Sequence, residues 1–202
     1  MIDAFLCTCS NDQLRYGLAV ATLARLKMSN AINLTVIRTS KALLDDNNCY
    51  TIDCPDLEFR VKRRQIAESL STTPIYLIAD DDILPFDKDF IEKGLEVMKR
   101  NPEYMAVMYR PIGLNLYTYG GNDEIEEYDE VGGLWLVRKG VVTTWPDIYT
   151  YEMGWNANWE TKIIHSKGYK TGIFKKLGCN HLGLGFSTLF WNENGYGPIP
   201  IP

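Results

Sequence analysis

The sequence predicts an α/β protein in which helices cover both faces of a mixed, mainly parallel sheet. Apolar runs of strand length alternate with helical patterns in the first half of the chain, which is typical of a three-layer fold. The run over residues 74–79 is apolar without interruption, which suits a strand buried on both faces. Because 202 residues fit one domain better than two, we expect a single domain over 1–202. Its Gly- and Pro-rich tail at about 192–202 should run over the surface.

The first half of the chain justifies this prediction element by element. Residues 2–8 are mostly apolar and predict the opening strand, which a polar run ends. Apolar residues then recur at helical spacing over 12–28, which predicts an amphipathic helix. Residues 32–38 predict the second strand, and 60–70 predict a short helix with a basic start. The strand at 74–79 completes the alternation.

The second half contains more mixed signals. A loop is expected after residue 79, and Pro85 should begin a helix that ends near Asn101-Pro102. Residues 111–131 are a Gly-, Asn- and acid-rich connection, and its stretch NDEIEEYDE predicts a solvated, mobile loop. The remaining expected elements are strands over 105–109, 133–137 and 169–174, and a helix over about 156–167.

Charge and cysteine usage limit the classes of partner and the location. The net charge of −5 gives no overall attraction to nucleic acid or to an anionic membrane. The N-terminus lacks a basic signal-peptide region, and no apolar stretch approaches the roughly 18–20 residues of a spanning helix. The five cysteines are an odd number without disulfide-dense spacing, so we expect a reducing, cytoplasmic location. Cys7 and Cys9 lack partners for a zinc site and predict buried thiols.

Three adjacent aspartates, Asp80, Asp81 and Asp82, follow the apolar run directly. Carboxylates this close repel one another, so a nearby cation would stabilise them. Carboxylate oxygens suit Mg²⁺ or Mn²⁺, and open α/β sheets bind ligands at the carboxyl ends of their strands. An ion there would neutralise a diphosphate leaving group. The alternative is a helix cap, for which one aspartate would suffice, so the sequence favours a metal site.

The run YLIADDDILP resembles the DXD motif of GT-A fold glycosyltransferases, especially glycosyltransferase family 2 and its relatives. Four other segments agree in order: the opening strand, the basic helix FRVKRRQIAESLSTTP, the glycine-led strand after residue 131, and the helix from Asn158 to Gly168. The resemblance implies a Rossmann-like α/β/α fold. It also implies a metal-dependent enzyme that moves a sugar from a nucleotide-diphosphate sugar, such as a UDP-sugar, to a hydroxyl acceptor.

The resemblance also implies roles for individual residues. Asp82 would ligate Mn²⁺ or Mg²⁺, with Asp80 and His181 as further metal ligands. Asp80 would alternatively contact the ribose or a metal-bound water. The alternative for His181 is a loop histidine bonded to the backbone. The donor side would comprise Thr8, Ser10, Arg63, Arg64, Asp80 and Asp81, and the acceptor side Gly132, Gly133, Trp135 and Trp159.

The sequence departs from the family pattern in two places. Where the family places a nucleotide-recognising acid, this chain has Arg38-Thr39-Ser40. Where family 2 usually places an aspartate base, this chain has Asn158, which cannot accept a proton. Glu160 is the first candidate for the base, with Glu152 and Asp147 behind it. The sequence equally supports the alternative that Glu160 is a solvated carboxylate, which the helix dipole favours in the first turn of a helix.

Two other functions remain open at this point. A sugar-phosphate nucleotidyltransferase would share the fold, but such enzymes carry a Gly-rich phosphate loop after the first strand, where this chain has Cys9-Ser10-Asn11-Asp12. A module that binds a nucleotide sugar without catalysis is the second alternative, suggested by Asn158. The acceptor is not indicated, and the net charge does not favour nucleic acid as an acceptor.

Overall fold

A computed structural model of the chain describes most of the molecule. The described residues are 1–8, 13–39, 42, 44, 49–54, 59–111, 120–129, 132–143 and 159–182, with backbone alone at 13–15, 59–61 and 159. The predicted tail at 192–202, Ser10, Asp147, Glu152 and Asn158 therefore lie outside the described residues.

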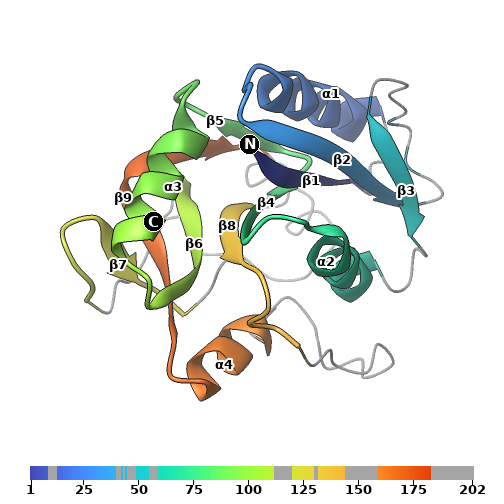
Figure 1. The fold of residues 1–202 in the computed structure, drawn as a ribbon. Coiled ribbons are helices and arrows are strands. Elements are labelled where there is room, and N and C mark those ends of the chain that lie inside the picture. The colour runs from blue at the N-terminus through green and yellow to red at the C-terminus, as the bar shows by residue number, and fades with distance from the viewer. Residues whose placement is uncertain are drawn as a thin grey trace, which may run out of the picture.

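Within these residues nine strands form one mixed sheet (Figure 1). In one half, β3 (Tyr50–Cys54), β2 (Ile32–Thr39), β1 (Ile2–Thr8) and β4 (Ile75–Asp80) lie side by side and parallel. The antiparallel strand β8 (Leu134–Arg138) joins β4 to the other half. That half contains β6 (Tyr104–Pro111), β9 (Lys170–His181), β5 (Ile83–Pro85) and β7 (Ile125–Glu127).

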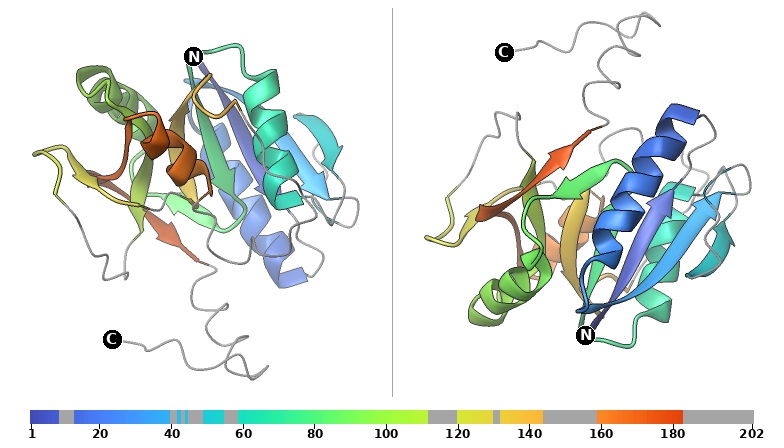
Figure 2. Two further views of the ribbon diagram at one scale, coloured as in Figure 1. Left: turned by 90° about the horizontal axis from the view of Figure 1, so that it is seen from below. Right: turned by 90° about the horizontal axis from the view of Figure 1, so that it is seen from above.

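Helices cover both faces of this sheet (Figure 2). On one face lie α1 (Gln13–Lys27) and α3 (Phe90–Arg100), and on the other lie α2 (Phe59–Leu70) and α4 (Trp159–Ser166). Because side chains alternate along a strand, β1 sends Leu6 toward α1 and Cys7 toward α2, into two separate cores. A strand buried on both faces is mostly apolar, which is why β1 and β4 could be predicted. The exceptions in β1, Asp3 and Thr8, are buried polar residues.

The structure corrects several predicted elements. The expected helix start at Pro85 is wrong, because Pro85 belongs to β5 and pairs with Cys179, and α3 begins only at Phe90. The stretch expected to be a mobile acidic loop contains β7, whose Ile125 is fully buried. The last strand runs on to residue 181 instead of ending near 174, so His181 lies in a strand and not in a loop.

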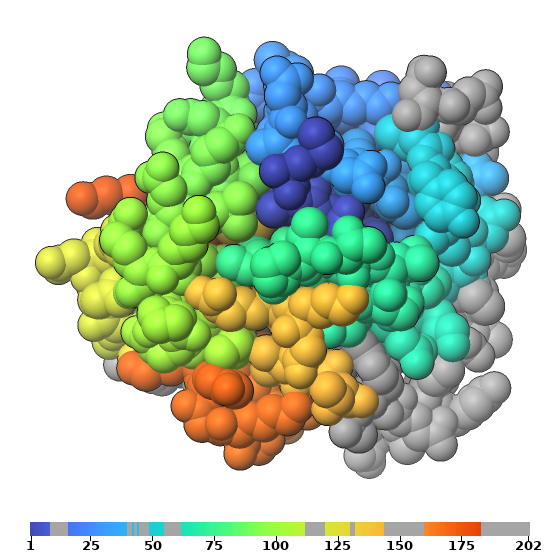
Figure 3. Space-filling view, viewed as in Figure 1, coloured from blue at the N-terminus to red at the C-terminus, as the bar shows by residue number. Residues whose placement is uncertain are grey.

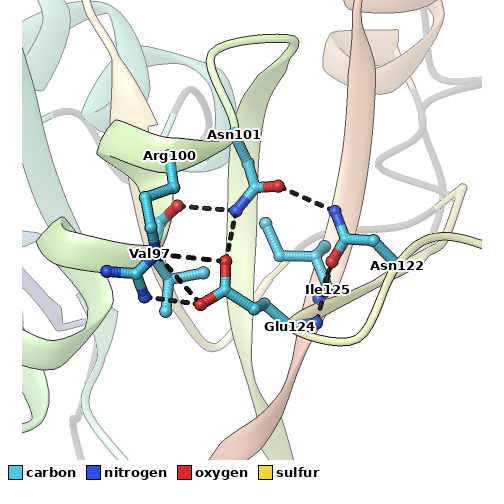
Figure 4. Close-up of polar contacts among 6 residues, drawn as sticks. All are labelled: Val97, Arg100, Asn101, Asn122, Glu124 and Ile125. Atoms are coloured by element: carbon cyan, nitrogen blue, oxygen red, sulfur yellow. Dashed lines mark hydrogen bonds and ion pairs between the residues drawn. The ribbon is translucent and has the colours of Figure 1, made fainter.

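A polar cluster fastens β7 to the end of α3 (Figure 4). The amide of Asn101 donates to Val97 O and to Glu124 Oε2, at 2.8 Å each. Asn122 donates to Asn101 Oδ1 at 2.7 Å and accepts from the backbone N–H groups of Glu124 and Ile125. Asn101 thereby satisfies the last turn of α3 and positions the turn before β7.

The segment after β8 lies against α2, as the space-filling view shows (Figure 3). The backbone N–H of Gly140 donates to Glu68 Oε1 at 2.6 Å, and Glu68 Oε2 accepts from the Tyr76 hydroxyl at 2.7 Å. These contacts fix α2 over β4 and β8. Among the described residues, no helix has the length and apolar character that crossing a membrane requires. The four described cysteines form no disulfide.

Candidate functional site

The three consecutive aspartates after β4 point in three different directions. Asp80 faces α2, where its Oδ1 accepts from Arg63 Nη1 at 2.7 Å. Asp81 faces β1, where its Oδ2 accepts from the Thr8 hydroxyl at 2.7 Å. Asp82 faces β9, where its Oδ1 lies near His181. Asp80 is the last residue of β4, and Asp81 and Asp82 lie in the turn that follows, so the turn gives the second and third directions.

The backbone of this turn is held from two sides. Thr22 of α1 donates through Oγ1 to Asp81 O at 3.2 Å and accepts from Ile83 N at 3.1 Å. Directly after β9, Leu182 N donates to Asp82 O at 2.8 Å. A buried threonine that satisfies two backbone groups fixes the turn, because either group left unpaired would carry its desolvation cost. The direction of the Asp82 carboxylate therefore depends on Thr22.

Asp82 and His181 form the part of the site best suited to a metal. Nε2 of His181 lies 3.2 Å from Oδ1 of Asp82, with side-chain exposures of 23% and 10%. That oxygen is buried and accepts no hydrogen bond from the described residues. One carboxylate oxygen and one imidazole nitrogen on converging side chains are ligand types that Mn²⁺ accepts. This donor pair fits a divalent ion whose other ligands come from a diphosphate and water.

Asp80, the third predicted metal ligand, contacts Arg63. Across the described residues, no group of three or more His, Cys, Asp or Glu side chains converges as a metal site would require. Burial opposes ionisation of Asp80, but the positive charges of Arg63, Arg64 and His181 outweigh it and hold the pKa of Asp80 below its ordinary value. The carboxylate is therefore ionised beside the Asp82–His181 pair.

Arg64 and Glu160 form a buried ion pair on the α2 side of the sheet. Arg64 Nη1 donates to Glu160 Oε2 of α4, and the side-chain exposures are 6% and 7%. The Arg64 guanidinium also stacks on Trp135 of β8, 3.8 Å from the ring centroid. Burial raises the pKa of Glu160 above its ordinary value, although Arg64 and Arg63 oppose this.

The residues expected on the acceptor side divide into surface and core. Gly133 has a φ of +69°, a conformation that favours glycine, and its carbonyl accepts from Asp80 N at 2.7 Å. Gly132 is half-buried, with open space where a Cβ would stand. Trp135 is buried in the core and covered by Arg64, so its ring offers no face to an acceptor in this arrangement. Only the backbone of Trp159 is described.

Sequence reasoning missed Thr22 and the pairing of Arg64 with Glu160. Thr22 is a polar residue on the buried face of α1, which is a signal, since a buried hydroxyl needs a partner. The ion pair joins residues 96 positions apart, and nothing in the spacing indicates it.

Comparisons with known proteins find the same architecture in several solved structures. No family model matches the sequence, and no curated protein matches it. Residues 1–349 of S. aureus TarS in complex with UDP match with a TM-score of 0.61 and 10% identity over 89% of this chain and 59% of that chain. The same fragment with UDP-GlcNAc matches with a TM-score of 0.59 and 10% identity, over 89% and 57%.

A second glycosyltransferase also matches. The mannosyltransferase PcManGT from Pyrobaculum calidifontis, in complex with GDP-Man and Mn²⁺, has a TM-score of 0.64 and 13% identity over 89% of this chain and 56% of that chain. This chain thus spans less than three fifths of the length of these structures. At such identities the likeness shows the fold, and it confirms the predicted α/β fold of GT-A glycosyltransferases.

Proposed function

We propose that this protein is a metal-dependent glycosyltransferase that moves a sugar from a nucleotide-diphosphate sugar to a hydroxyl acceptor. The observation that carries the proposal is the convergence of Asp82 and His181, with Asp80 and Arg63 beside them, at the carboxyl end of β4. Open α/β sheets bind ligands at such an edge. TarS with UDP-GlcNAc and PcManGT with GDP-Man and Mn²⁺ share the fold, which supports a nucleotide-sugar donor.

Asp82 and His181 would hold the divalent ion, Mn²⁺ or Mg²⁺. When bound, such an ion supplies a positive charge that stabilises the diphosphate as the sugar bond breaks. The surrounding residues orient the Asp82 carboxylate. Thr22 and Leu182 fix the backbone on either side of Asp82, so its carboxylate points at His181 before any ligand arrives.

The donor would lie against the β1 and α2 side of the same edge. Arg63 offers guanidinium N–H groups that suit phosphate oxygens, and the ionised Asp80 suits a ribose hydroxyl. Thr8 and Asp81 bond to each other, so we assign them to shaping the turn beneath the donor. Ser10 stays a predicted donor contact.

The acceptor would approach from the Gly132–Gly133 side, where β8 begins at the same edge. A general base must lie within hydrogen-bond reach of the acceptor hydroxyl. Glu160 and Glu152 are the residues that the sequence predicts for that role, of which Glu152 lies outside the described residues. Trp159 stays a prediction for the acceptor wall. A cytoplasmic location likewise stays a prediction.

A donor panel with mass detection, run with and without Mn²⁺, tests this function. We expect Mn²⁺-dependent loss of one nucleotide-diphosphate sugar, by transfer or by slow hydrolysis. Consumption of a nucleoside triphosphate and a sugar phosphate with release of pyrophosphate would instead identify a nucleotidyltransferase. Binding of a nucleotide sugar with neither hydrolysis nor transfer, across acceptors of several classes, would identify a non-catalytic module.

A further inference from the structure

Four charged side chains connect α4 to the end of β4 through α2. Glu160 pairs with Arg64, and the adjacent Arg63 pairs with Asp80. Arg63 and Arg64 are consecutive residues of α2, so the two ion pairs lie next to each other. The opposite charges of each pair stabilise one another, so removal of one partner leaves the other without its counter-charge beside the second pair.

We propose that Glu160 is a positioning residue that holds Arg64 on Trp135 and so keeps Arg63 on Asp80, and that it is not the base of the transfer reaction. This assignment rests on the proposed function. It replaces a role for Glu160 in taking the acceptor proton with a role in orienting the donor side.

The burial of Glu160 supports this role. Its side chain is 7% exposed, and Oε2 is engaged by Arg64. A base must reach a substrate hydroxyl directly or through one water, and this carboxylate faces a guanidinium inside the protein. Nε of Arg64 is buried without an acceptor in the described part of the chain. Glu160 is therefore the anchor that fixes this guanidinium.

The stacking of Arg64 on Trp135 links the pair to the site. Trp135 of β8 pairs with Ile78 of β4, and Ile78 lies two residues before Asp80. Arg64 therefore fixes α2 against the strand that carries the aspartates. Without Glu160, two neighbouring arginines would share one carboxylate, and Arg64 would compete with Arg63 for Asp80. Glu160 thus keeps the Arg63–Asp80 pair in one arrangement.

Two substitutions at one position distinguish positioning from proton transfer. Glu160→Gln still accepts a hydrogen bond from Arg64 but cannot take a proton, and Glu160→Ala does neither. We expect Glu160→Gln to keep kcat within about tenfold of wild type, with the acid limb of the pH profile unchanged. Glu160→Ala should raise the donor KM by about tenfold or more, because the loss falls on substrate orientation.

Glu68→Gln is the matched control. It removes a carboxylate from the same helix, where Glu68 bonds to Tyr76 and Gly140 instead of to the site, and it should leave the donor KM unchanged. If Glu160→Ala does not fold, Arg64→Met/Glu160→Met replaces it, since apolar replacement of both partners of a buried pair is often tolerated. That double variant should show the raised donor KM with transfer still measurable.

The possible outcomes separate this assignment from the proposed function. A wild-type protein that transfers no sugar overturns the proposed function, and this assignment with it. Suppose that the wild-type protein is active and that Glu160→Gln lowers kcat by about 10²–10⁴-fold, as much as Glu160→Ala does, and removes the acid limb of the pH profile. Glu160 is then the base, and this assignment alone is wrong. The positioning role is also overturned if the donor KM is unchanged in both Glu160→Ala and the double variant.

Discussion

His181 lies opposite Ile83 in the antiparallel pairing of β9 with β5, and this register brings its imidazole to Asp82. A shift of one residue would turn His181 to the other face of the sheet. The pair therefore depends on β5, a strand of three residues that follows the aspartates directly. The chain thus converts a cluster of like charges into one oriented carboxylate beside one imidazole.

Mn²⁺ together with a nucleoside diphosphate should stabilise the wild-type protein, and Asp82→Asn or His181→Gln should remove most of that effect. A ligand present at 100 times its Kd adds about 2.7 kcal/mol, which corresponds to roughly 5–11 °C in Tm for a chain of this size. A thermal melt with each nucleoside diphosphate measures it. Asp123→Asn, an exposed carboxylate outside the site, is the control and should keep the full shift. An undiminished shift in Asp82→Asn would remove Asp82 from the metal site.

Thr22→Val should weaken both the fold and the metal response. Valine keeps the shape, but it loses the bond to Asp81 O and leaves the buried Ile83 N without its acceptor. We expect a loss of about 1–3 kcal/mol in the free energy of unfolding, measured by urea titration, and a smaller Mn²⁺-dependent shift in Tm. Thr51→Val is the control, because within the described part of the chain the Thr51 hydroxyl bonds only to the nearby Cys49 O, at 3.5 Å. If Thr22→Val and Thr51→Val change the free energy of unfolding and the Mn²⁺-dependent shift in Tm equally, Thr22 does not fix the turn that carries Asp82.

Asp3 should make the stability depend on pH in the acid range. Burial raises its pKa, but hydrogen bonds from Thr72, Thr73 and Asn33 outweigh this and hold it below the ordinary value. The unfolded chain then binds the proton more tightly than the folded one. The stabilisation is full above the unfolded pKa of about 3.9 and is lost as the pH falls through the lower folded value.

Asp3→Asn should therefore cost about 1.5–3 kcal/mol at pH 7, and the difference from wild type should shrink as the pH falls below about 3.9. Urea unfolding at several pH values measures this. Asp123→Asn removes an exposed carboxylate and should leave the pH dependence unchanged. A constant difference between Asp3→Asn and wild type across this range would show that the carboxylate charge is not the cause.

The sequence was sufficient to predict the elements that are buried on both faces. Most residues of β1 and β4 are apolar because helices cover both sides. The strands it missed lack such a signal. β5 and β7 have three residues each, which is too short for a periodic pattern, and β3 exposes Tyr50 and Asp53 at the edge of the sheet.

The resemblance to GT-A enzymes implied that Asp82 and His181 lie together, and the structure places Nε2 of His181 3.2 Å from Oδ1 of Asp82. Their metal-binding role stays a prediction. The divergence of the three aspartates depends on partners from β1, α2 and β9, which only the packed sheet brings together. The engagement of Glu160 by Arg64 likewise follows from the packing of α2 and α4. Spacing along one chain contains no information on such contacts.

Two helical glycines should respond in opposite ways to alanine, which tests the packing of α3 on the sheet. At Gly94 a Cβ would stand 2.4 Å from Tyr109 Oη and 2.8 Å from Leu136 Cδ1, and that hydroxyl donates to Phe90 O at 2.8 Å. Overpacking there should cost about 1–3 kcal/mol, more than the gain of up to about 1 kcal/mol in helix propensity. At exposed Gly17 of α1 nothing lies within 4 Å, so alanine should stabilise by about 0.5–1 kcal/mol. Urea unfolding of both variants gives the two signs, and a stabilised Gly94→Ala would mean that α3 lies farther from β6 and β8 than this structure places it.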